Sequence, residues 1–440
     1  MLVITNAVIF DGQRLLPGRH SVTLDGNTIA AVDDLSTVTS VSTTTTVIDA
    51  AGMTLMPGLI TSHLHADFYK FDINDSDRLG KERPPGVMMA IGVRTCRVLL
   101  ESGFTGYSGA SCSNDVDAQL KMAIEEDLIP GPRIRACGHH LGTTGDMNTG
   151  GRWWKSYQTP GTDVCADGPD ALRTLVRQEI NRGAETIKIF ASSGHGQLHR
   201  TTRNMSRAEI AAIIESAHER GARVRAHVSD KAMIMECIEL GLDVVDHGDD
   251  IDDEVIAAMV EAGTFWVPSL IFPWSLLKLG FAEQNGVTQA QYDHVRSILP
   301  AAQAAGVRIL IGDDYSGVFR DAIENDPLDH QIGNYGREFA YYGAIDGLSP
   351  EDVLSWGTRN AGELLVDAPA RVGVIEPGAL ADLILVDGDP VQDLSILARP
   401  TEALRTVIRD GVLVIDRLGD QRAAQITCRP QAVGIGVGAN

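Results

Sequence analysis

Apolar and polar residues alternate in short runs at both ends of the chain, whereas the middle repeats a longer pattern. Residues 1–57 are rich in Val, Ile and Thr and are broken by Asp11-Gly12 and Asp25-Gly26 turns, which is typical of a small antiparallel sheet. Short strands return after about residue 366. We therefore expect residues 1–57 and 366–440 to form one small composite β-sandwich domain.

Between residues 58 and 365, short β-branched runs alternate with stretches whose apolar residues recur every three or four positions. Residues 206–220 show this helical spacing, and Ser206 followed by Glu209 predicts a capping box. The predicted strands cover 59–65, 104–108, 133–138, 186–191, 223–228, 244–247, 265–270 and 308–312. Eight β-then-α units in series predict an α/β fold, a (β/α)8 TIM barrel.

Composition narrows the class of partner. The 440 residues carry a formal net charge of -22, which would repel nucleic acid and anionic membranes, so we expect a small-molecule substrate. No apolar run approaches the roughly 20 residues that a membrane span needs. The six cysteines are scattered without a C-x-x-C pair, as in a reducing compartment, and we expect the protein to be cytoplasmic.

The pair His63 and His65 is the first candidate for chemistry. Both lie at the end of the apolar run 56–65. Residues two apart on a strand point to the same side, and imidazole is the commonest protein ligand for a divalent transition metal. The spacing therefore indicates that both rings share one metal site.

Further polar residues lie on or after the other predicted strands, where a barrel places its chemistry. Lys188 interrupts an apolar strand, and a buried ammonium without a partner is unfavourable. An unmodified lysine would either pair with a carboxylate or extend to the barrel mouth; otherwise the lysine is carboxylated and its new carboxylate bridges two cations. His227 and His247 end consecutive strands, and either Asp313 or Asp314 after the eighth strand can bind metal and accept a proton.

Together these motifs resemble the amidohydrolase superfamily of metal-dependent hydrolases, in the branch of imidazolonepropionase-like and prolidase-like proteins. The resemblance covers nearly the whole chain. It depends on 57–65 with its two histidines, Gly131-Pro132-Arg133, Ile187-Lys188-Ile189, Ala226-His227, Asp246-His247-Gly248, 375–383 and Arg409-Asp410-Gly411.

The resemblance implies two divalent metal ions, zinc by analogy, and a homo-oligomer. It implies the metal ligands His63, His65, Lys188, His227, His247 and Asp314, with Lys188 carboxylated on its side-chain nitrogen. The family's eighth-strand motif is Gly-Thr-Asp, which places Asp314 on the catalytic aspartate. Asp313 then stands in the threonine position, and this departure leaves the choice between the two carboxylates open.

The implied reaction is hydrolysis of a C–N bond of amide, urea or carbamate type by a hydroxide that bridges the two cations. Asp314 would take the proton from the nucleophile and pass it to the leaving nitrogen. Mononuclear deaminases of similar fold carry a glutamate shortly after the fifth-strand histidine, and residues 228–231 contain none. The remaining alternatives are an Xaa-Pro or Xaa-amino-acid dipeptidase, a cyclic-amide hydrolase and a non-catalytic scaffold.

The loops after the strands predict the substrate pocket. We expect His139, His140, His195 and Tyr69 to contact the substrate. Aromatic residues on the same loops favour a bulky apolar substrate group, although they can equally pack the loops or an oligomer interface. A dipeptidase would need a cation for the substrate carboxylate, and the candidates are Arg152, Arg200 and Arg203.

Overall fold

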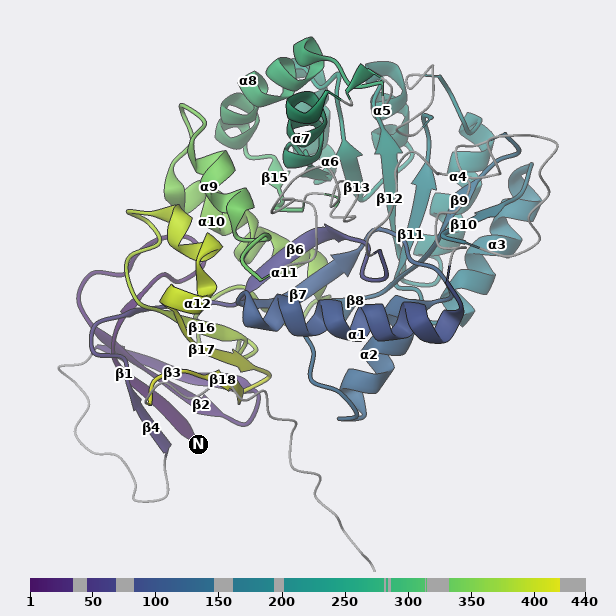
Figure 1. Cartoon of the computed structure of the whole chain (residues 1–440). Helices are drawn as coiled ribbons and strands as arrows, with labels where there is room; N and C mark the ends of the chain where they lie inside the picture. The colour runs from purple at the N-terminus through teal and green to yellow at the C-terminus, as the bar shows by residue number, and fades with distance from the viewer. Residues whose placement is uncertain are drawn as a thin grey trace, which may run out of the picture.

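Strands from both ends of the chain share one sheet at one side of the molecule (Figure 1). The computed structural model describes residues 1–34, 46–68, 83–145, 161–193, 202–280, 282–283, 286–312, 314 and 332–419. In order across the sheet the strands are β18 (Val412–Asp416), β17 (Leu404–Arg409), β16 (Leu383–Val386), β5 (Thr54–Pro57), β1 (Leu2–Ile9), β2 (His20–Asp25) and β3 (Thr28–Asp34), and β4 (Thr46–Asp49) pairs with β1.

The strand β16 joins the two ends. It pairs antiparallel with β5 on one side and β17 on the other, and it is buried at every position. A strand that is covered on both faces reads as a continuous apolar run, and β16 has the sequence LILV. Its side chains at Leu383 and Leu385 pack with Ile4, Ile9 and other apolar residues of the amino-terminal strands.

The middle of the chain forms an α/β fold with parallel sheets, as the alternating pattern predicts. One sheet has the order β6 (Leu59–Leu64), β7 (Phe104–Gly109) and β8 (Arg133–Arg135). The other has the order β10 (Asp163–Cys165), β9 (Cys137–Gly142), β11 (Thr186–Phe190), β12 (Arg223–Val228), β13 (Val244–His247), β14 (Phe265–Val267) and β15 (Arg308–Ile309).

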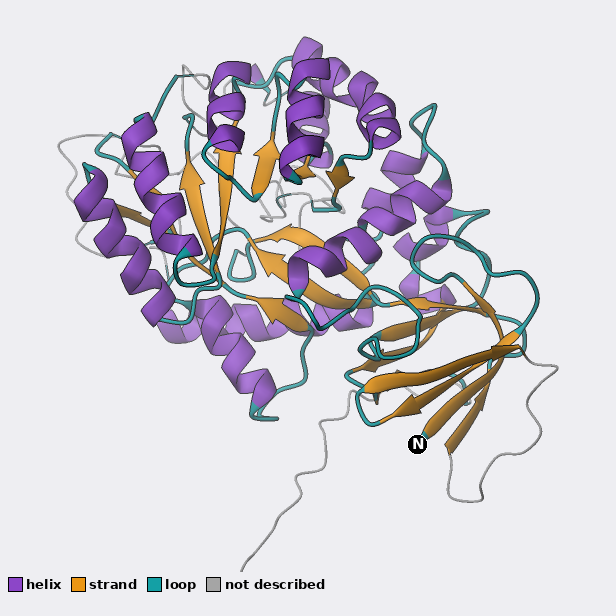
Figure 2. Cartoon of the chain, turned by 180° about the vertical axis from the view of Figure 1, so that it is seen from behind, coloured by secondary structure: helices purple, strands orange, loops and turns teal. Residues whose placement is uncertain are grey.

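Helices lie around the outside of these strands (Figure 2). They are α1 (Pro85–Glu101), α2 (Val116–Glu125), α3 (Pro169–Asn181), α4 (Arg207–His218), α5 (Lys231–Glu239), α6 (Asp253–Ala262), α7 (Ile271–Leu279), α8 (Gln289–Ala305), α9 (Arg337–Gly343), α10 (Pro350–Trp356), α11 (Arg359–Leu365) and α12 (Pro400–Ala403), with a 3₁₀ turn at Leu394–Ala398. The predicted capping box of Ser206 and Glu209 is confirmed at the start of α4. None of the described helices is both long and apolar enough to cross a bilayer.

The two parallel sheets meet at two places: where β8 is followed by β9 in the chain, and where β6 lies beside the segment after β15. Only Ala136 separates β8 from β9, so the predicted third strand is divided and continues beyond residue 138. At the other edge, the Ser62 N–H donates to the Ile311 carbonyl at 2.7 Å. The seventh strand is shorter than predicted because Pro268 follows Val267, and proline has no N–H for the ladder.

A small network of ion pairs connects the terminal sheet to the α/β region. The Arg133 guanidinium, on β8, donates to Asp382 from Nε at 2.9 Å and to Asp410 from Nη2 at 3.1 Å. The Asp410 N–H also donates to the Asp382 carboxylate at 2.6 Å. Three of the sequence motifs, far apart in the chain, are therefore one structural contact. It fixes the terminal sheet beside the amino-terminal ends of the parallel strands.

Candidate metal centre

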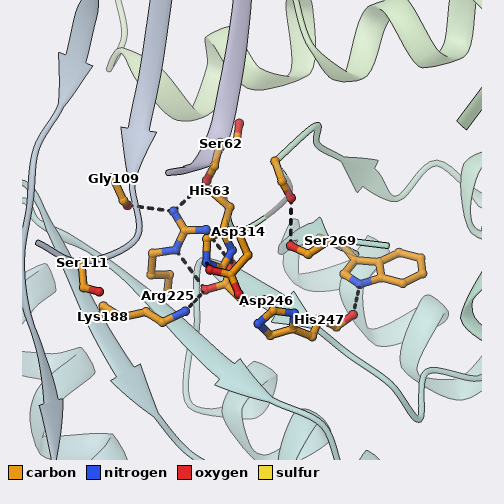
Figure 3. Close-up of polar contacts among 12 residues, drawn as sticks. Ser62, His63, Gly109, Ser111, Lys188, Arg225, Asp246, His247, Ser269 and Asp314 are labelled. Carbon is orange, nitrogen blue, oxygen red and sulfur yellow. Dashed lines mark hydrogen bonds and ion pairs between the residues drawn. The ribbon is translucent and has the colours of Figure 1, made fainter. Parts of the chain in front are cut away.

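The predicted ligands lie on the parallel strands or in the segments that follow them, and all but Lys188 are near or beyond a carboxyl end. Lys188 pairs in register with Arg225, and Phe190 pairs with His227. Directly paired residues of neighbouring strands share a face, and side chains two apart on one strand do too. Lys188, Arg225 and His227 therefore project into the same interior. Figure 3 shows Lys188 and Arg225 meeting Asp246 there.

Asp246 and His247 are neighbours in sequence, so a regular strand would send them to opposite faces. The structure brings both to His63: the carboxylate lies 3.2 Å from its Nδ1, and the His247 ring centroid is 5.5 Å from that of His63. The backbone of His247 adopts φ 67°, a left-handed conformation that is unfavourable for a non-glycine residue. This turn at the end of β13 redirects the imidazole into the interior.

The histidines and Asp314 converge on one volume. Oδ1 of Asp314 lies 2.9 Å from Nε2 of His65 and 3.4 Å from Nε2 of His63. His63, His247 and Asp314 each offer a ligand atom, and these atoms lie within 4.8 Å of one another. The His227 ring is 4.5 Å from that of His247, centroid to centroid. This set of imidazoles with a carboxylate matches the donors that divalent transition metals prefer.

Neighbouring groups orient the rings. The Ser111 carbonyl lies 2.9 Å from Nδ1 of His65, which leaves Nε2 on the side of Asp314. Phe68 stacks on His65 at 4.4 Å, and Phe190 stacks on His227 at 4.8 Å, centroid to centroid. A partner on the far ring nitrogen fixes the tautomer and direction of a ligand histidine. These contacts fix the orientation of the His65 and His227 rings.

Asp314 is held at a tightly packed point of the chain. Its φ is 56°. Two residues earlier, Gly312 accepts a hydrogen bond from the Ser269 hydroxyl at 2.8 Å and donates to Glu338 at 2.7 Å. A Cβ at Gly312 would lie 2.4 Å from the His63 backbone nitrogen, so only glycine fits. Burial would raise the pKa of Asp314, but the nearby His63 and His65 hold it well below its usual range.

Lys188 forms a buried ion pair with Asp246. Its Nζ lies 2.5 Å from Oδ2 of that carboxylate, which is the first of the two alternatives that the sequence left open for an unmodified lysine. Burial lowers the pKa of Lys188, and Asp246 opposes that shift. Burial would raise the pKa of Asp246, but Arg225 and Lys188 hold it well below its usual range.

The structure separates the predicted substrate-binding residues. His140 pairs in register with Lys188, and its ring lies 4.7 Å from that of Phe190, so it faces the interior. His139 points to the other face of β9, where Nδ1 lies 3.1 Å from the Glu179 carboxylate of α3. The structure therefore does not bring His139 to the centre, because adjacent residues of a strand alternate faces. Tyr69 and His195 lie outside the described residues, as does Asp313.

Sequence reasoning did not single out Arg225. Its signal was similar to that of Lys188: a cation between two apolar neighbours, Val224 and Ala226, two residues before His227. Among the arginines proposed for a substrate carboxylate, Arg152 and Arg200 lie outside the described residues. Arg203 binds Glu236 at 2.6 Å.

Comparisons with known proteins agree with this geometry. The model of the amidohydrolase family matches residues 54–414. The chain is 28% identical over 395 residues to an ochratoxinase from Aspergillus niger, covering 82% of this chain and 75% of the relative. Two solved structures are also similar. An amidohydrolase has a TM-score of 0.81 and 28% identity, covering 95% of this chain and 100% of its own. A Xaa-Pro dipeptidase has a TM-score of 0.79 and 25% identity, covering 94% and 99%. The chain belongs to the amidohydrolase family.

Proposed function

We propose that this chain is a metal-dependent hydrolase that cleaves a C–N bond of amide, urea or carbamate type in a small molecule. The observation that carries the proposal is the position of Asp314, whose Oδ1 lies within 3.4 Å of Nε2 of both His63 and His65. A carboxylate at that point can bind metal and exchange a proton in the same place. Membership of the amidohydrolase family supports the same reaction class.

The proposed ligands are the residues that the sequence predicted: His63, His65, His227, His247, Asp314 and Lys188, the last in carboxylated form. The donor set fits divalent ions, because imidazole and carboxylate atoms lie close together in a buried site. Bound divalent ions, which we expect to be two zinc ions, would lower the pKa of water to about 7 and polarise a carbonyl group.

Asp314 would move the proton. A carboxylate is ionised at neutral pH, so Asp314 can accept a proton there. It can take a proton from the attacking water and return it to the leaving nitrogen, which must be protonated to depart. His140 faces the same interior beside Phe190, where its ring can hold the carbonyl or a neighbouring polar group of the substrate.

The predicted (β/α)8 barrel would place all these groups at one mouth, with the barrel at about 58–365 and a composite β-sandwich at 1–57 and 366–440. The short link between β8 and β9 and the bond from Ser62 to Ile311 support a closed barrel. A cytoplasmic homo-oligomer remains our expectation for the assembly.

A dipeptidase is the second candidate, favoured by the likeness to a Xaa-Pro dipeptidase. A dipeptide bond is itself an amide bond, so a dipeptidase would carry out the reaction type proposed above. The described arginine on the relevant loop, Arg203, is occupied by Glu236. Arg152 and Arg200 lie outside the described residues. N-acyl and N-aryl amides, ureas and carbamates stay our first substrate class, with free dipeptides and cyclic amides as the alternatives.

The test combines metal content with a hydrolysis screen. The purified protein should hold about two metal ions per chain and should cleave members of one substrate group among dipeptides, N-aryl amides, carbamates, ureas and cyclic amides. Asp314→Asn should abolish turnover and keep metal, because an amide cannot accept the proton. Metal-free protein with no turnover, prepared in the presence of zinc and bicarbonate, would favour a non-catalytic scaffold and refute the proposal.

A further inference from the structure

A buried arginine, Arg225, contacts the residues that precede two of the predicted metal ligands, His63 and His247. The side chain of Arg225 is 0% exposed. A guanidinium without water is very unfavourable unless its donors are satisfied, and here other strands supply the acceptors. Nη1 donates to the carbonyls of Ser62 at 2.7 Å and Gly109 at 2.8 Å. Arg225 thus connects β12 to β6 and β7, across the interior (Figure 3).

The rest of the guanidinium holds Asp246. Nε donates to Oδ2 at 3.0 Å and Nη2 donates to Oδ1 at 2.5 Å, a bidentate arrangement that fixes the plane of the carboxylate. Oδ1 of Asp246 also lies 3.2 Å from Nδ1 of His63. Arg225 therefore acts on His63 twice. It binds the carbonyl of the preceding residue and it holds the carboxylate that faces the ring.

Lys188 competes for the same carboxylate. In the unmodified protein its Nζ lies 2.5 Å from Oδ2 of Asp246. A lysine that becomes a metal ligand as a carboxylate can no longer donate to Asp246 as an ammonium. Removing one partner from a buried ion pair is strongly destabilising when the remaining charge has no other partner. Asp246 has one, because the bidentate contact with Arg225 remains.

We propose that Arg225 is a positioning residue for the metal centre, which keeps Asp246 paired and His63 oriented once Lys188 has been carboxylated. The inference rests on the proposed function, since it presupposes that divalent ions bind at this site. The covalent step needs carbon dioxide. The Lys188 ammonium first loses a proton to solvent. The Nζ lone pair of the neutral amine then forms a bond to the carbon of carbon dioxide, a C–O π pair moves onto oxygen, and a second amine proton leaves to solvent. The positive charge of Lys188 is replaced by a negative one, and Arg225 becomes the remaining cation beside Asp246.

The experiment compares Arg225→Met and Arg225→Lys with a matched control. Arg223→Met removes the same kind of side chain from the same strand, but Arg223 binds Asp367 and the Glu363 carbonyl. Each protein is dialysed against fixed concentrations of zinc while bicarbonate is varied. The readouts are zinc per chain and, with carbon-13 bicarbonate, the NMR signal of the carboxylated lysine.

We expect R225M to bind zinc about 10- to 100-fold more weakly, the range found when groups that orient metal ligands are lost. It should also need more bicarbonate for half-loading and show a weaker carboxylated-lysine signal. R225K should lie between R225M and the parent, because an ammonium supplies charge without the fork. R223M should match the parent in zinc content and in the NMR signal, whatever it does to stability.

Full zinc loading of R225M at the parental zinc and bicarbonate concentrations would overturn the inference. If R225M does not fold, R225K decides. It keeps a cation beside Asp246 without the bidentate fork, so parental zinc affinity and a parental NMR signal in R225K would count against the role of the fork. A parent that binds no zinc would refute the proposed function as well, whereas an active, zinc-loaded R225M would refute this inference alone.

Discussion

Replacing Asp117 with asparagine should make the stability of the protein less dependent on pH. Asp117 is fully buried at the start of α2, where Oδ1 accepts from the Tyr107 hydroxyl at 3.0 Å and Oδ2 accepts from the Cys137 N–H at 3.2 Å. Burial raises the pKa of this carboxyl to about 8, and the charge of Asp67 adds to the shift. The backbone bond from Cys137, the Tyr107 hydroxyl and the charge of Arg225 oppose it. The other titratable neighbours are the buried thiols Cys96, Cys112 and Cys137.

The sign follows from proton linkage. Between the unfolded pKa of 3.8 and the folded pKa of about 8, the folded protein keeps a proton that the unfolded chain releases. Stability from this group is therefore fully present below the lower pKa and is lost as pH rises towards the upper one. The loss is about 1.4 kcal/mol per pH unit, or about 2.7 kcal/mol from pH 5 to pH 7. Asparagine is neutral throughout and removes this slope.

The assay is urea unfolding of the metal-free protein at pH 5, 6 and 7, followed by tryptophan fluorescence and circular dichroism. The stability of D117N relative to the parent should rise by about 2.7 kcal/mol across that range. Asp346→Asn changes an exposed carboxylate and serves as the matched control, which should run parallel to the parent. A constant difference between D117N and the parent from pH 5 to pH 7 would refute the assignment of a protonated Asp117.

Other changes test separate parts of the structure. Asp314→Asn should reduce turnover to background with zinc retained, measured by the hydrolysis screen and by metal analysis; measurable activity would show that another group, with Asp313 the next candidate, transfers the proton. Asp382→Ala leaves Arg133 without its main buried partner and should lower the free energy of unfolding by about 3 kcal/mol in urea titrations. Ser206→Ala removes the cap of α4 and should cost about 1 kcal/mol, also read from urea unfolding. His140→Gln should lower kcat/KM strongly, whereas His139→Gln should mainly lower the melting temperature, because its partner is Glu179 on the far face of the strand.

Much of the fold could be predicted because it follows from local patterns. The change from short alternating runs to strands followed by helices indicated where the parallel sheets lie, and Ser206 with Glu209 indicated where α4 begins. Strand ends were less accurate. The third strand is divided at Ala136 and the seventh ends at Val267, because a proline and a change of sheet partner, rather than side-chain periodicity, end the hydrogen-bond ladder there.

The candidate site shows the same division. The sequence by itself determined which histidines, which lysine and which pair of aspartates were candidates, because an α/β barrel places its reactive side chains on or just after its strands. Only the tertiary structure decided which of them meet, because side-chain direction depends on strand register and on single backbone angles. His139 and His140 diverge since neighbours on a strand alternate faces, whereas Asp246 and His247 converge since His247 adopts a left-handed backbone conformation. Arg225 emerged from the structure alone, because a buried cation is understood only when its partners on other strands are known.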